Sequence, residues 1–332
     1  MAEEAHLPDP SRSQRIPLRF AIGDRLHLVV PTGADRDEVR RLEITFGPVG
    51  GMVLTSVREV GLPWRTAELR SLAEMDWPQA ALAWRAMAVF AQLCEEVAGL
   101  SHAVDEWHQQ RRPRQLDCRI GETFLKWMPK RQIADELRSW AGPRSIQRLI
   151  RYPTRADLSP HVDGDDVRNI LRVCRSSRRG ATAAFGQLSS LAEDDVWRTF
   201  IRWKHRLTAT SPNKVPVWLP HQSSEGQTAI DSALVDGFGV IDWPPGRSTV
   251  PYLILWPAEK QDIAAFLQAS ANAVALIRFL VDSTLRFGLT SVPVLPWFLE
   301  LGAELSAEEE ASIARLEASN YRLHLITSVS SR

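Results

Sequence analysis

The sequence predicts an α+β protein with an N-terminal antiparallel β segment, a long central helix, a basic helical middle with a helix-turn-helix-like hairpin, and a C-terminal mixed α/β domain. Short apolar runs separated by turn formers come first, a helical apolar period follows, and strand-like runs mixed with helices close the chain. We therefore expect a disordered tail at 1–14, a β-rich segment at 15–75, a basic helical region at 76–208 and an acidic mixed α/β domain at 209–332.

The β-rich segment rests on apolar runs that are bounded by glycine, proline and aspartate. The strand candidates are Ile16–Ile22, Arg25–Val30, Arg41–Phe46 and Met52–Val60. An antiparallel sheet of about four strands is the simplest assembly of such runs.

A long helix is predicted at 79–110. Asp76 is the expected N-cap, with Gln79 three residues later completing a capping box. Apolar residues then recur every three or four positions, as Leu82, Ala86, Val89, Leu93, Val97, Leu100, Val104 and Trp107. Such a seam is typical of a central core helix, and the alternative is a helix for self-association or for docking a protein partner.

Residues 118–153 predict two short helices joined by a tight corner. Gly142 is expected to take positive φ and end the first helix, and Pro143 suits the first turn of the second. The second helix leaves a polar face of Arg144, Gln147, Arg148 and Arg151. A helix-turn-helix presents Arg and Gln to the major groove in this way, where they can bond guanine and adenine. Arg138 stands where that motif usually has glycine and the corner is longer than the common form, so an ordinary hairpin with a solvated basic face is the alternative.

Two further helices are expected to carry arginine stripes. The first, about 165–179 and ended by Gly180, has Arg168, Arg172, Arg175 and Arg179 on its outer side. The second, about 193–207, has Arg198, Arg202 and Arg206. Stripes of this kind could follow a phosphate backbone, and acidic flanking regions could neutralise them instead.

The charge of the chain is unevenly divided. Residues 111–214 contain 22 Lys and Arg against 11 Asp and Glu, although the whole chain has 40 of each. A basic middle favours an anionic partner or an internal contact with acidic flanks. Three scattered cysteines indicate a reducing, cytoplasmic setting, and the apolar helix near 263–285 contains polar residues that favour a core helix rather than a membrane span.

Enzymatic motifs are weak in this sequence. His161, Asp163, Asp165 and Asp166 could hold a divalent ion, but Asp165 or Asp166 is better explained as a helix cap. GxSxG, HExxH, P-loop, dinucleotide-turn and paired CxxC patterns do not occur, so no cofactor is expected. Ser306 and Glu309 form a further capping box for a helix near the C-terminus.

Taken together, these patterns favour a non-enzymatic nucleic-acid-binding protein, with duplex DNA as the preferred partner. The expected contact residues are Lys130, Arg131, Arg144, Gln147, Arg148, Arg151, Arg168, Arg172, Arg175, Arg179, Arg198 and Arg202. The alternative is a scaffold subunit that docks through the long helix and the acidic C-terminal domain. A third hypothesis is a divalent-metal nuclease that uses Asp163, Asp165 or Asp242.

Overall fold

The computed structural model describes most of the chain between Leu18 and Thr327. The described residues are 18–22, 25–29, 44–46, 50–51, 53–110, 120–127, 132–192, 196–197, 199–200, 209–222, 228–242, 252–290, 296–297, 305–319 and 326–327. The predicted disordered tail at 1–14 therefore lies outside the described residues.

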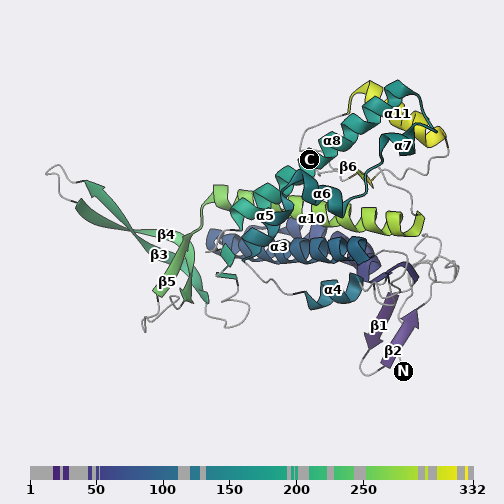
Figure 1. Ribbon diagram of the computed structural model, residues 1–332. Helices are drawn as coiled ribbons and strands as arrows, with labels where there is room; N and C mark the ends of the chain where they lie inside the picture. The colour runs from purple at the N-terminus through teal and green to yellow at the C-terminus, as the bar shows by residue number, and fades with distance from the viewer. Residues whose placement is uncertain are drawn as a thin grey trace.

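Helices make up the body of the molecule (Figure 1). They are η1 (Val57–Gly61, a π-helical turn), α2 (Leu62–Glu74), α3 (Gln79–Gln110), α4 (Ile120–Lys126), α5 (Ile133–Trp140), α6 (Pro143–Leu149), α7 (Arg155–Leu158), α8 (Gly164–Leu191), α10 (Lys260–Thr290) and α11 (Ala307–Ala318). The strands are β1 (Leu18–Ile22), β2 (Arg25–Val29), β3 (Ala209–Gln222), β4 (Thr228–Asp242), β5 (Tyr252–Pro257), β6 (Pro296–Trp297) and β7 (Ile326–Thr327). The predicted α+β class is wrong, because the described part of the chain is mostly helical.

The predicted N-terminal sheet of about four strands is the main error in the fold class, because among the described residues of that segment only β1 and β2, near the predicted Ile16–Ile22 and Arg25–Val30, form an antiparallel pair. Residues 44–46 and 53–74 are helical, and they include most of the runs Arg41–Phe46 and Met52–Val60 that were expected to be strands. Phe46, Leu54 and Leu62 are fully buried against the helical core. A short apolar run has no period that separates a buried strand from a buried helix, and here tertiary packing decides for helix.

Helix α3 is the centre of the core. Its predicted extent to Gln110 is confirmed, but it begins at Gln79 itself, so the Asp76 capping box is wrong. The Gln79 side chain instead donates to the carbonyl oxygen of Ala258. Most α3 side chains from Ala80 to Trp107 are buried, which is the pattern of a helix surrounded by neighbours.

Helix α10 packs along α3 and supplies the other half of the core. The Phe90 and Phe266 rings lie with centroids 5.4 Å apart across this contact. By length and composition α10 could also cross a membrane, but more than half of its apolar window is buried inside the protein, as in a core helix.

The last third of the chain, which was expected to be a mixed α/β domain, contains both strands and helices. Strands β3, β4 and β5 form an antiparallel ribbon in that order, and Figure 1 shows this ribbon extending away from the helices. The root of the ribbon contacts α3, where the Trp84 and Phe238 rings meet edge to face at 5.1 Å. Because α10 packs on α3 and α8, the last third of the chain belongs to the same helical body.

Candidate nucleic-acid interface

Helices α5 and α6 form the predicted hairpin. The corner consists of Ala141 and Gly142, and Pro143 occupies the first turn of α6 as expected. Gly142 has φ −118° and ψ 145°, so the expected positive φ is wrong and this residue is instead the extended N-cap of α6. The Ser145 hydroxyl donates to the carbonyl oxygen of Ser139 at 2.9 Å and closes the corner.

The apolar sides of both helices are buried. The buried residues are Ile133, Ala134, Leu137 and Trp140 on α5, and Ile146 and Leu149 on α6. Both helices pack on α3 and α8, which fixes the orientation of the hairpin on the core.

The end of α6 is held by side chains from the last turns of α3. The Arg148 guanidinium lies 3.5 Å from the Asp105 carboxylate and 5.3 Å from the centre of the Trp140 ring. His108 Nε2 lies 3.1 Å from the carbonyl oxygen of Leu149, so that nitrogen carries the proton and donates. These contacts position α6 from the core side.

The outer face of α6 is polar. Arg144, Gln147 and Arg148 are exposed on it. Arg151 is also exposed, but α6 ends at Leu149, so the expected continuation of the helix to Arg151 is wrong. Arg144 and Arg151 have no carboxylate partner among the described residues. Arg148 forms an ion pair with Asp105, so the positive charge of Arg148 is partly neutralised.

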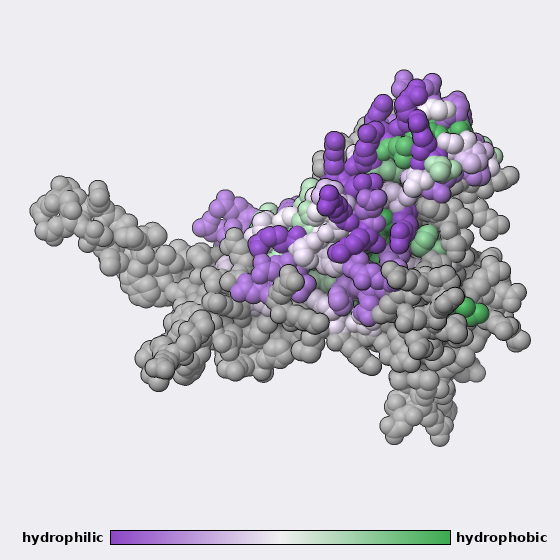
Figure 2. All heavy atoms as spheres, in the orientation of Figure 1, coloured by the Kyte–Doolittle hydropathy of each residue, from purple (hydrophilic) through white to green (hydrophobic). Residues whose placement is uncertain are grey.

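Helix α8 carries the first predicted arginine stripe. It runs to Leu191, and Gly180 is buried inside it, so the predicted end at Gly180 is wrong. Arg168, Arg172, Arg175 and Arg179 are all exposed. Figure 2 shows hydrophilic side chains gathered over α5, α6 and α8 on one side of the molecule.

The stripe is partly neutralised within the chain. Arg168 pairs with Asp165 one turn earlier, and Arg172 lies 3.9 Å from Glu309 of α11. Arg175 and Arg179 have no acidic partner in the part of the chain that the structure describes. The side chains of Lys130, Arg131, Arg198 and Arg202 lie outside the described residues.

The hairpin is joined to α8 through contacts of Tyr152. The Tyr152 hydroxyl lies 3.4 Å from Ser177 Oγ, and Arg178 stacks 5.2 Å from the centre of the Tyr152 ring. Burial raises the pKa of the Tyr152 hydroxyl well above its usual value, and burial raises the pKa of the Cys174 thiol to about 12. Both groups stay protonated near neutral pH, so they add no negative charge beside the basic face.

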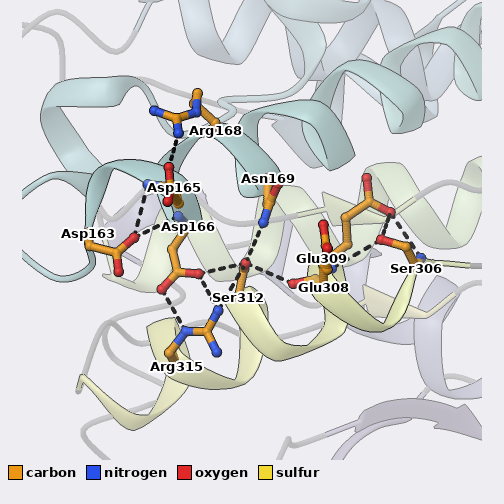
Figure 3. Close-up of polar contacts among 10 residues, drawn as sticks. All are labelled: Asp163, Asp165, Asp166, Arg168, Asn169, Ser306, Glu308, Glu309, Ser312 and Arg315. Carbon is orange, nitrogen blue, oxygen red and sulfur yellow. Dashed lines mark hydrogen bonds and ion pairs between the residues drawn. The ribbon is translucent and has the colours of Figure 1, made fainter.

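The aspartates that could have formed a metal site have structural contacts (Figure 3). Asp163 is the N-cap of α8, because its carboxylate accepts from the backbone N–H groups of Asp165 and Asp166 at 3.0 and 2.9 Å. The cap expected at Asp165 or Asp166 is therefore wrong. No group of three potential metal ligands occurs among the described residues, and the Asp242 side chain lies outside them.

Asp166 has a contact that the sequence did not reveal. Its buried carboxylate accepts from Arg315 Nε at 2.7 Å and from the Ser312 hydroxyl at 2.7 Å, both on α11. The hydrogen bonds from Arg315 lower the pKa of the Asp166 carboxyl below its usual value. Arg315 is 149 residues away in sequence, so no local pattern indicates this pairing.

Comparisons with known proteins add no relative to this description. No protein-family model matches the sequence, and neither the curated proteins nor the solved structures give a match.

Proposed function

We propose that this protein binds duplex DNA without catalysing a reaction, and that the face formed by α6 and α8 is the contact surface. The observation that carries the proposal is the exposed side of α6, where Arg144 and Gln147 project from a helix anchored to the core and Arg151 follows its end. Beside it, α8 offers Arg175 and Arg179, again without acidic partners among the described residues.

The chemistry of these side chains suits distinct parts of DNA. Arg144 and Gln147 lie on α6. Arg144 can present two N–H donors to a base edge in the major groove, and Gln147 can present one donor and one acceptor. Arg151, Arg175 and Arg179 are suited to phosphates, where each contact releases counterions. Arg148 is already held by Asp105 and Trp140, so it enters the groove in a fixed orientation.

The test is fluorescence anisotropy with a labelled duplex at about 50 to 200 mM salt. The three arginines assigned to phosphates, Arg151, Arg175 and Arg179, predict a slope of log K against log salt of about −3. Replacing Arg144 with Ala should weaken binding by about 1–3 kcal/mol, because both donors to a base are lost.

Arg70→Ala is the matched control. Arg70 is an exposed arginine on α2 with no ion-pair partner among the described residues, so its replacement changes the net charge equally. An equal loss for Arg70→Ala and Arg144→Ala would show binding by net charge alone. Absence of binding at low salt would remove the proposal.

A further inference from the structure

Helix α11 is attached to α8 by a group of charged and hydrogen-bonding side chains, which we call the α11 clasp. It consists of Asp166 and Asn169 on α8 and Ser312 and Arg315 on α11. Asn169 Nδ2 donates to Ser312 Oγ at 3.0 Å, and Arg315 donates to both oxygens of Asp166. In Figure 3, Asp166 and Asn169 point toward α11, whereas Arg168 points away from it.

The same helix brings negative charge to the arginine stripe. Helix α11 contains four glutamates and one arginine. Glu309 lies 3.9 Å from Arg172, and its side chain is only 14% exposed, against 59% for Arg172. Glu309 therefore faces the stripe from a fixed position, because it also accepts from the backbone N–H of Ser306 in the capping box of α11.

The attachment combines the α11 clasp with a small apolar contact, in which Ile313 and Leu316 are buried. Ser312, Ile313 and Leu316 are the buried residues of α11, and the described element against which it chiefly packs is α8. Ion pairs and hydrogen bonds with an exposed partner are weakened by competing ions, whereas apolar burial is not. A dense polyanion is a strong competitor of this kind.

We propose that α11 is an autoinhibitory helix that neutralises the edge of the α8 arginine stripe and is displaced when a nucleic acid binds. This inference rests on the proposed function, since the displaced contact belongs to the same surface. Displacement frees Arg172 for a phosphate and removes the glutamates from the edge of the interface. Docked α11 therefore lowers affinity, and bound DNA loosens α11 by the same factor.

Arg315→Ala is the informative variant, because it separates release from simple charge. Removing one positive charge should weaken DNA binding if α11 stays in place. Losing the bonds to Asp166 should release α11 and tighten binding, by about fivefold or more for a typical coupling between sites. The salt slope should become steeper by about 0.9 as Arg172 gains a phosphate. Adding Arg172→Ala to this variant should abolish that increase.

Two more variants make the result independent of one substitution. Leu316→Asn leaves the charge unchanged and removes buried apolar contact, so it should release α11 and give the same tightening. Glu317→Gln changes the charge of an exposed residue on α11 without touching the clasp, so α11 should remain docked. Amide hydrogen exchange over 307–318 reports release directly, with and without the labelled duplex.

Faster exchange in α11 together with tighter DNA binding supports the inference. Faster exchange with unchanged or weaker binding overturns it and leaves the proposed function intact. Unchanged exchange in both Arg315→Ala and Leu316→Asn also overturns it, since the clasp would not hold α11. If exchange accelerates but neither wild type nor variants bind DNA, the proposed function fails and this inference fails with it.

Discussion

Helix α3 meets α10 through apolar side chains, whereas the contact of α8 with α11 adds charged and hydrogen-bonding side chains to the buried Ile313 and Leu316. In the first pair, Phe90 and its neighbours are fully buried and the aromatic ring of Phe266 closes the contact. In the second, a buried carboxylate is bonded to a guanidinium whose side chain is 57% exposed. Apolar burial depends little on salt or pH, so the stability of the α3–α10 contact should change little with either. The charged part of the α8–α11 contact should respond to ions and protonation. Helix α11 is therefore attached in a way that depends on ions and protonation, and it lies beside the proposed interface.

The largest effect is expected for Phe90→Ala. Phe90 is fully buried at the α3–α10 contact, and truncating such a side chain typically lowers the free energy of unfolding by about 3–5 kcal/mol. Urea unfolding followed by circular dichroism measures the change. Trp77→Ala is the comparison, because Trp77 is 45% exposed and its loss should change stability by less than about 0.5 kcal/mol. Similar losses for the two variants would contradict the described core.

A smaller effect is expected for Gly288→Ala, which tests how tightly α10 is packed. A Cβ at Gly288 would overlap the ring of the fully buried Phe46, so the ring or helix must shift. Overpacking of this kind lowers the free energy of unfolding by about 1–3 kcal/mol.

The matched change is Gly186→Ala on α8, where a Cβ would meet no atom within 4 Å. That substitution should stabilise the protein by about 0.5–1 kcal/mol, because alanine is the better helix former. Both values come from the same urea titration. A stabilising Gly288→Ala would show that α10 is less closely packed than its burial indicates.

Sequence reasoning succeeded where the signal is local and periodic. The long helix ending at Gln110 is confirmed because its apolar period extends over many turns, and the Ser306–Glu309 capping box is confirmed because its two members are three residues apart. Glycine was less informative. Helix α5 does end just before Gly142, but Gly142 lacks the expected positive φ and Gly180 does not end α8, because glycine permits many conformations and requires none of them.

The remaining errors concern contacts between distant segments. The run that includes Leu54 is buried by helices that follow it by many residues, and nothing within the run selects helix over strand. The Asp166–Arg315 pair spans the whole C-terminal half of the chain, so a single sequence shows only two ordinary charged residues. Exposure of Arg144 and Gln147 follows the helical period, but which arginines keep a carboxylate partner depends on tertiary structure.

The smallest effect is a pH dependence of the α11 clasp. Hydrogen bonds from Arg315 lower the pKa of Asp166 below its ordinary value of 3.8, so the charged carboxylate stabilises the folded state. A depressed folded pKa contributes stability that is fully present above the unfolded value and is lost as the pH falls through the folded one. Asp166→Asn should therefore be less stable than wild type by about 1–2 kcal/mol at pH 6, and the difference should shrink below about pH 4.

Asp135→Asn is the control for this comparison. Asp135 pairs with Arg138 one turn later, and both side chains are largely exposed, at 47% and 63%. Such a surface pair contributes about 0.5 kcal/mol or less, so its removal should leave stability nearly unchanged across the same pH range. A pH-independent difference between wild type and Asp166→Asn would mean that α11 is held by Ile313 and Leu316 rather than by charge. In that case the contrast between the two helix pairings would disappear, and α11 would be as permanent as α10.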